Sequence, residues 1–235
     1  MMKLFLWTFA MLFAAQSLAG QAAVPETYLS AITAQLQIQW PKNKTINLVF
    51  HGHSVPGGYW NDHRVETLRS YPYLVLKALK EKYPYALINI IVTAKGGENA
   101  VDGQKRFADV LAHKPDVLFI DYALNDVGIG LDKAKTAWEQ MIRQADSAGI
   151  KVILLTPSPD QRMNLADSTN LLEQHARQIR ALAAAYHTGL ADSYSVFQQV
   201  LKKEGSIKPY MSWVNHPNEK GHLLIAAAIL NYFGW

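Results

Sequence analysis

Five short apolar runs recur along the chain, and segments with helical spacing separate them. The runs are rich in valine, isoleucine and leucine, and they cover Ile46–Phe50, Leu87–Thr93, Val117–Asp121, Val152–Thr156 and, more weakly, Gly189–Asp192. Short apolar strands that alternate with helices pair in parallel through βαβ crossovers. The pattern therefore predicts a sheet of about five parallel strands between two layers of helices, which is a three-layer α/β/α fold.

Two of the intervening segments show clear helical periodicity. Residues Asp132 to Ala148 place Trp138, Met141 and Ile142 on one face and end before Gly149, as an amphipathic helix does. A second helix is expected from Asn170, because Asn170 and Glu173 have the spacing of a capping box. Pro72 interrupts a helical pattern between residues 64 and 83 and predicts a break or kink there.

The N-terminus has the pattern of a secretory signal peptide. Lys3 precedes an apolar run from Leu4 to Ala15, and small residues follow up to Gly20. This run is too short to span a bilayer. We expect residues 1–19 to be a signal peptide, residues 20–235 to form one domain without a membrane span, and the protein to be exported to the periplasm or the medium.

Composition excludes several classes of function. Lys and Arg exceed Asp and Glu by 23 to 19, which gives a net charge of +4, and the basic residues are scattered. We therefore expect no nucleic-acid partner. The chain has no cysteine, so thiol chemistry and disulfide bonds are excluded.

The segment Thr45 to Tyr59 carries the first candidate for chemistry. Its apolar run is expected to be a buried strand, and Ser54 follows in a loop rich in glycine and proline. Ser54 is a candidate nucleophile at the carboxyl edge of the sheet, where open α/β sheets bind ligands. Three other interpretations are a turn or capping hydroxyl, a metal site at His51 and His53, and a phosphate cradle in the glycine-rich loop.

Three later segments add groups to the same edge. Gly96 and Gly97 follow the second strand and lead into a helix, so their N–H groups can face an anion. Asn125 follows the third strand, and His216 lies in a loop before the last helix. A nucleophile, two sources of hydrogen-bond donors and a base are the parts that acyl transfer needs.

These four segments resemble the four sequence blocks of the SGNH (GDSL-type) hydrolases, in the same order and with similar spacing through most of residues 20–235. The resemblance implies a flavodoxin-like fold and esterase or acylhydrolase activity without a cofactor. It also implies that Ser54 is the nucleophile and His216 the base. The N–H groups of Ser54 and Gly97 and the side chain of Asn125 would form the oxyanion hole.

The chain departs from the family pattern at three positions. His53 stands where the family usually has Asp, and Ala123 replaces the usual Gly. The third departure is Trp213, which occupies the position of the Asp that orients the catalytic histidine. We expect the Trp213 carbonyl to accept the Nδ1–H of His216, with Asp192 as the alternative orienting group.

Three aromatic residues adjoin the predicted catalytic segments and are candidates for substrate binding: Tyr59, Trp60 and Trp213. The sequence thus predicts an exported serine esterase that removes short acyl groups, such as acetyl, from a carbohydrate or a small ester. The alternative is a pseudoenzyme that binds glycans without turnover. We expect no metal site, and the other histidines, His222 among them, should be solvated or structural.

Overall fold

Strand β1 (Thr45–Gly52) lies inside a five-stranded parallel sheet with β2 (Leu87–Val92), β3 (Val117–Asp121), β4 (Lys151–Leu155) and β5 (Gly189–Ala191). The strand order β2-β1-β3-β4-β5 in this computed structural model is that of the flavodoxin-like folds. The structure describes residues 20–235. The expected signal peptide, residues 1–19, lies outside the described residues.

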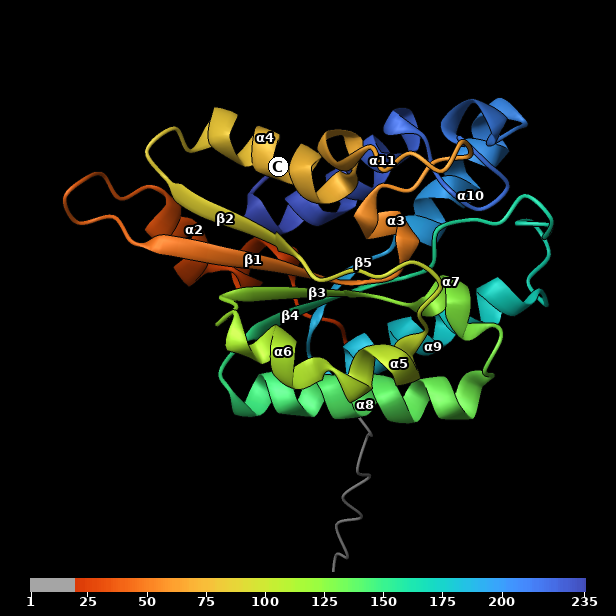
Figure 1. Ribbon diagram of the computed structural model, residues 1–235, viewed down its shortest axis with the longest axis horizontal. Helices are drawn as coiled ribbons and strands as arrows, with labels where there is room; N and C mark the ends of the chain where they lie inside the picture. Colours follow the sequence, from red (N-terminus) through yellow and green to blue (C-terminus); the bar gives the residue numbers. More distant parts are fainter. Residues whose placement is uncertain (1–19) are drawn as a thin grey trace, which may run out of the picture.

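Helices cover both faces of the sheet (Figure 1). On one side lie α4 (Tyr71–Lys82), α10 (Ser193–Glu204) and α11 (Glu219–Leu230), and on the other lie α5 (Ala100–Lys105), α6 (Phe107–Ala112), α8 (Leu131–Ser147) and α9 (Leu171–Tyr186). The remaining helical segments are short, and they are α1 (Pro25–Tyr28), α2 (Ser30–Leu36), α3 (Ser54–Gly57), α7 (Ala123–Asp126) and the 3₁₀ turns Thr67–Arg69, Lys208–Tyr210 and Asn231–Phe233. The predicted three-layer fold is confirmed.

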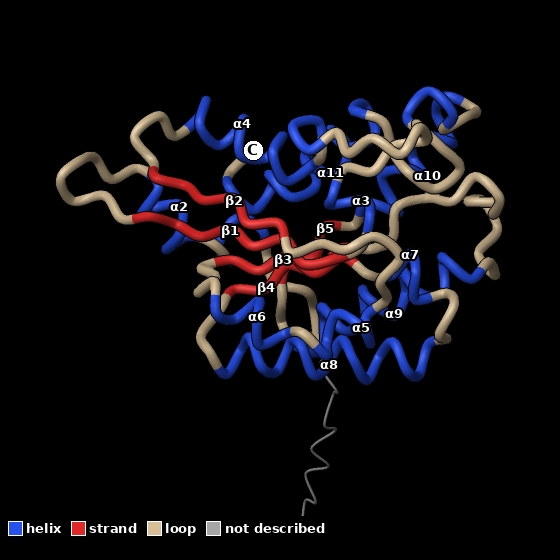
Figure 2. Tube along the Cα trace, viewed as in Figure 1, coloured by secondary structure: helices blue, strands red, loops and turns tan. Residues whose placement is uncertain are grey.

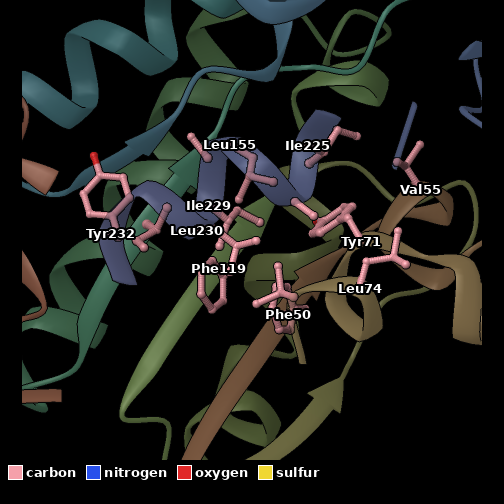
Figure 3. Packing of buried hydrophobic residues seen from close by; sticks show 14 of the residues in the cluster. Phe50, Val55, Tyr71, Leu74, Phe119, Leu155, Ile225, Ile229, Leu230 and Tyr232 are labelled. Carbon is pink, nitrogen blue, oxygen red and sulfur yellow. The ribbon is translucent and has the colours of Figure 1, made fainter. Parts of the chain in front are cut away.

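The core is divided by the sheet into two clusters because successive side chains of a strand point to opposite faces. In β1, Leu48 and Phe50 pack toward α4 and α11, whereas Val49 packs toward α5, α6 and α8. Phe50 stacks on Phe119 of β3 with ring centroids 4.2 Å apart. Figure 3 shows this first cluster, with α11 residues packed over Phe50 and Phe119. The strands are thereby fixed in register up to the edge where Ser54 lies.

The helix predictions hold with shifts of one residue. Helix α8 begins and ends one residue earlier than expected, and the side chain of Asn170 caps α9 by accepting the Glu173 N–H at 2.9 Å. Pro72 lies in the first turn of α4, where its missing N–H costs no helical hydrogen bond. The predicted break is therefore the beginning of the helix rather than a kink within it. No helix among residues 20–235 is long and apolar enough to cross a membrane.

Candidate active site

The loops that follow β1, β2 and β3 meet at the carboxyl edge of the sheet (Figure 2). Gly52 at the end of β1 pairs with Asp121 at the end of β3. A side chain at Gly52 would lie 2.5 Å from the Asp121 carbonyl oxygen, so only glycine allows this close approach. The chain then turns into α3, whose first three residues, Ser54, Val55 and Pro56, are buried.

Ser54 and His216 are in hydrogen-bond contact. The distance between Ser54 Oγ and His216 Nε2 is 2.8 Å, although the two residues are 162 positions apart in the sequence. The loop that carries His216 is held closed by Ser212, whose N–H donates to the His216 carbonyl at 2.9 Å. Burial lowers the pKa of His216 to about 4, with a smaller contribution from His53. The imidazole is therefore neutral near pH 7, as a base that accepts the Ser54 proton must be.

The expected orientation of His216 by Trp213 is wrong. The Trp213 carbonyl accepts a hydrogen bond from Gln161 Nε2 at 2.9 Å, and His216 Nδ1 is buried without a hydrogen-bond partner among residues 20–235. Asp192 does not replace it, because its carboxylate is bound by Arg180 at 2.7 Å and caps α10. The main chain at Trp213 turns its N–H, not its carbonyl, toward the loop, since that N–H donates to the His216 carbonyl.

The three predicted oxyanion-hole segments lie side by side. The Lys95 N–H donates to the Gly52 carbonyl at 3.0 Å, which brings the turn with Gly97 against the end of β1. Asn125 Nδ2 donates to the Glu98 carbonyl at 2.8 Å, so one of its two N–H bonds is used and one remains. Within residues 20–235, the N–H groups of Ser54 and Gly97 donate to no protein acceptor. These donors are available to an oxyanion.

Asp126 stabilises this arrangement, a contribution that the sequence did not suggest. Its buried carboxylate accepts the Ala100 N–H and the Trp138 indole N–H, each at 2.7 Å. Burial raises the pKa of Asp126 to about 6, and the two hydrogen bonds oppose this rise. The loop of Asn125 is thereby attached to the beginning of α5, directly after the turn that contains Gly97.

The aromatic candidates differ in their positions. The Tyr59 ring lies against the backbone of Gly57 and Gly96, where added side chains would approach it to 3.0 and 3.3 Å. Trp213 is 44% exposed and stacks on the His216 ring at an interplanar angle of 25°. Trp60 is half-buried in the adjacent loop, and its backbone N–H donates to the Arg64 carbonyl. Tyr59 and Trp213 thus border the site directly.

The two histidines of the His-x-His motif have different surroundings, because His51 lies in β1 whereas His53 lies beyond its end, directly before α3. The ring of His51 contacts Thr93 Oγ1 at 2.9 Å and the Gly103 carbonyl at 3.2 Å, on the side of α5. His53 Nδ1 accepts the Val55 N–H, and its Nε2 lies 3.4 Å from an Asp121 oxygen. No group of three potential metal ligands occurs among residues 20–235. His51 and His53 therefore do not share a site.

Two further buried residues near Ser54 escaped the sequence reasoning. Asp121 ends β3 and Tyr71 begins α4. The hydroxyl of Tyr71 donates to Asp121 Oδ2 at 3.0 Å. An acid at the end of a fully apolar strand was the one available signal for such a contact.

Comparison with known proteins agrees with this geometry. The chain matches the GDSL-like lipase/acylhydrolase family over residues 50–224, and it belongs to this family. The predicted resemblance is thereby confirmed, and family membership supports a hydrolase of the esterase type. No curated protein sequence matches the chain.

Solved structures share the fold. Axe2, an acetylxylan esterase from Geobacillus stearothermophilus, is 22% identical with a TM-score of 0.68, over 81% of this chain and 94% of Axe2. A catalytic mutant of Axe2 gives a TM-score of 0.70 at 22% identity, over 85% and 97%. A two-domain esterase (CEX) active on acetylated mannans has a TM-score of 0.71 at 20% identity, over 92% of this chain and 54% of that protein.

Proposed function

We propose that this protein is an exported serine esterase that removes short acyl groups, such as acetyl, from a carbohydrate through an acyl-Ser54 intermediate. The observation that carries the proposal is the 2.8 Å contact between Ser54 Oγ and His216 Nε2 beside unused backbone donors. A nucleophile within hydrogen-bond reach of a neutral base is the geometry of covalent acyl transfer.

The reaction would proceed in two halves. His216 Nε2 accepts the Ser54 proton as Oγ attacks the ester carbonyl, and the N–H groups of Ser54 and Gly97 and the Asn125 amide bind the resulting oxyanion. The tetrahedral intermediate collapses when the alcohol leaves with the proton from His216. Water then attacks the acyl-serine in the same way, and the carboxylic acid and free Ser54 are released.

The carbohydrate part of the proposal is supported by the exposed aromatic surface. Trp213 and His63 meet edge to face with ring centroids 6.3 Å apart, and Trp213 adjoins the proposed base. An aromatic face suits stacking on a sugar ring. The solved relatives that share the fold include esterases of acetylated xylan and mannan. We therefore propose an acetylated glycan as the substrate class.

Activity is tested first on a chromogenic acetate ester. The wild-type protein should release the chromophore, and an organophosphonate or sulfonyl fluoride should inactivate it and add mass to the peptide with Ser54. Ser54→Ala should abolish both effects. Ser193→Ala is a matched control, since its hydroxyl donates only to the Thr156 carbonyl. Labelling at another residue, or full activity of Ser54→Ala, would exclude the mechanism.

Substrate class is tested on acetylated xylan, acetylated mannan and aryl esters of increasing acyl length. Acetate release from a glycan should exceed release of longer acids. A second candidate function, glycan binding without turnover, is favoured by the unpartnered His216 Nδ1. Tight glycan binding by wild type and Ser54→Ala alike, without acetate release, would establish that alternative.

A further inference from the structure

A chain of buried polar residues lies behind the contact between Ser54 and His216. His53 precedes α3, Asp121 ends β3, Tyr71 begins α4, and His222 lies in the first turn of α11. All four are at most 3% exposed. Because burial of polar groups is unfavourable unless they are paired, such a cluster needs a structural or functional reason.

His53 is fixed in one tautomer. Its Nδ1 accepts the N–H of Val55 at 3.2 Å, so the proton of the ring lies on Nε2. Nε2 in turn lies 3.4 Å from Asp121 Oδ1, and neither atom has a hydrogen-bond partner among residues 20–235. The carboxylate therefore faces the ring proton, and the other ring nitrogen holds the backbone of the residue directly after Ser54.

The second oxygen of Asp121 extends the chain toward His216. It accepts the Tyr71 hydroxyl at 3.0 Å, and the Tyr71 N–H donates to His222 Nδ1 at 3.3 Å. In Figure 3, Tyr71 lies beside Phe50, between the sheet and α11. His222 belongs to α11, the helix that follows the His216 loop. One carboxylate is thus connected to both segments that carry the reacting groups.

We propose that Asp121 and His53 form a positioning pair that replaces the family's usual Asp before the nucleophile. An Asp at that position can cap α3 with its own carboxylate, whereas a histidine can do so only with Nδ1 unprotonated. The negative charge of Asp121, 3.4 Å from Nε2, favours the proton on that nitrogen and so keeps the cap on the Ser54 turn. Through Tyr71 and His222, the same carboxylate ties α11 to that turn. Because His216 has no orienting acid at position 213, these four buried residues hold Ser54 and His216 at hydrogen-bond distance.

The positioning pair predicts that the kinetic effects of substitutions at His53 and Asp121 are coupled. This prediction rests on the proposed esterase function. Asp121→Asn keeps the shape but removes the charge, and His53→Asn keeps an acceptor for Val55 but no longer reaches Asp121. Each variant should lower kcat on the acetate ester about tenfold with little change in KM. Since Asp121 acts through His53, the double variant should lose about tenfold as well, rather than about a hundredfold. Additive losses, or unchanged kcat in either single variant, would overturn the proposal.

A milder pair of variants keeps the test valid if the Asp121 variants fold poorly. Tyr71→Phe removes the hydroxyl that binds Asp121, and Tyr194→Phe removes the hydroxyl of another fully buried tyrosine, which accepts a hydrogen bond from Asn170 Nδ2 at 3.0 Å. Both should lower the melting temperature to a similar extent. Only Tyr71→Phe should lower kcat and slow the labelling of Ser54 by an organophosphonate. Equal kinetics of the two variants would reject a positioning role.

The outcome is separable from that of the proposed function. Wild-type hydrolysis that disappears in Ser54→Ala establishes the function, whatever the variants of Asp121 do. If that hydrolysis is present and the losses at His53 and Asp121 add, only the positioning pair is rejected. If wild-type protein shows no Ser54-dependent hydrolysis, both proposals are rejected together.

Discussion

Asp121 ends β3 and Asp192 directly follows β5 in the same sheet, but the surroundings of the two carboxylates differ. Asp192 accepts two hydrogen bonds from Arg180, one from Thr156 Oγ1 and one from the Ser195 N–H. Asp121 is almost fully buried, and its carboxylate accepts the Tyr71 hydroxyl and lies near His53, with no ion pair to an Arg or Lys among residues 20–235.

This difference separates two parts of the carboxyl edge of the sheet. One is a structural edge at the end of β5, and the other is a functional edge at the ends of β1 and β3. At the β5 edge, each oxygen of the Asp192 carboxylate accepts hydrogen bonds, from the Arg180 cation or from the N–H that it caps. Such pairing favours stability. At the edge shared by β1 and β3, buried polar atoms of His53, Asp121 and His216 have no hydrogen-bond partner among the described residues. A buried polar group without a partner costs stability, so its presence at this edge needs another reason. Variants on the two edges should therefore change different measured quantities.

Removing the proposed base should have the largest effect. His216→Ala should lower kcat by about 10⁴-fold or more, because the Ser54 hydroxyl then has no proton acceptor. His175→Ala is the control: His175 is a buried histidine like His53, but it lies in α9. Initial rates on the acetate ester measure both. A His175→Ala loss of similar size would mean that burial, and not the site, decides the outcome.

Removing one oxyanion donor should have the next largest effect. Asn125→Ala should lower kcat about 10²- to 10³-fold with little change in KM, since the donor acts mainly in the transition state. Asn99→Ala is the control, because Asn99 lies next to the Gly97 turn and its side-chain oxygen caps α5. It loosens the same segment, so its kcat should fall much less. A change confined to KM would assign Asn125 to ground-state binding.

The sequence predicted the elements that have a periodic apolar pattern or a local capping or turn residue at their ends. Five strands and the cap at Asn170 follow from apolar runs and local hydrogen bonding, and the structure confirms the strands with boundaries near those expected. Long-range side-chain contacts gave no such signal. The contact between Tyr71 and Asp121 joins residues 50 positions apart, and nothing in either neighbourhood specifies it. The prediction that the Trp213 carbonyl orients His216 was wrong for a similar reason, because Gln161 from a loop distant in the sequence donates to that carbonyl.

Acid pH should affect both activity and stability, with a sign set by burial. Burial lowers the pKa of His216 to about 4 and that of His222 to about 3, because it disfavours the imidazolium form. The unfolded chain then binds protons first as the pH falls below the unperturbed value of about 6.5. The contribution of these two neutral histidines to the free energy of unfolding is therefore complete above about pH 6.5 and is lost progressively toward about pH 4.

Denaturant unfolding and initial rates at several pH values check this expectation. The free energy of unfolding should decrease from about pH 6.5 downward, while kcat should persist to about pH 5 and fall through an apparent pKa near that of His216. Replacing His175, whose pKa is also lowered by burial to about 4, with Gln should reduce the acid sensitivity of stability and leave the pH profile of kcat unchanged. A kcat profile with its midpoint at the ordinary histidine value would contradict the buried, neutral His216.

The smallest kinetic effect is expected at Asp192, the satisfied carboxylate. Asp192→Asn removes the charge that binds Arg180, but it retains an oxygen that can cap α10 at Ser195. Hydrogen bonds to a charged group that is partly exposed contribute modestly, so we expect a loss of about 1–2 kcal/mol in stability. For a chain of this size, that corresponds to about 2–8 °C in melting temperature. Because no contact of Asp192 reaches Ser54 or His216, kcat should stay within about twofold of wild type. Asp121→Asn should show the opposite profile, with a larger loss in kcat than its change in melting temperature would explain. A tenfold loss of kcat in Asp192→Asn would remove the distinction between the two edges and return Asp192 to the role of the orienting acid.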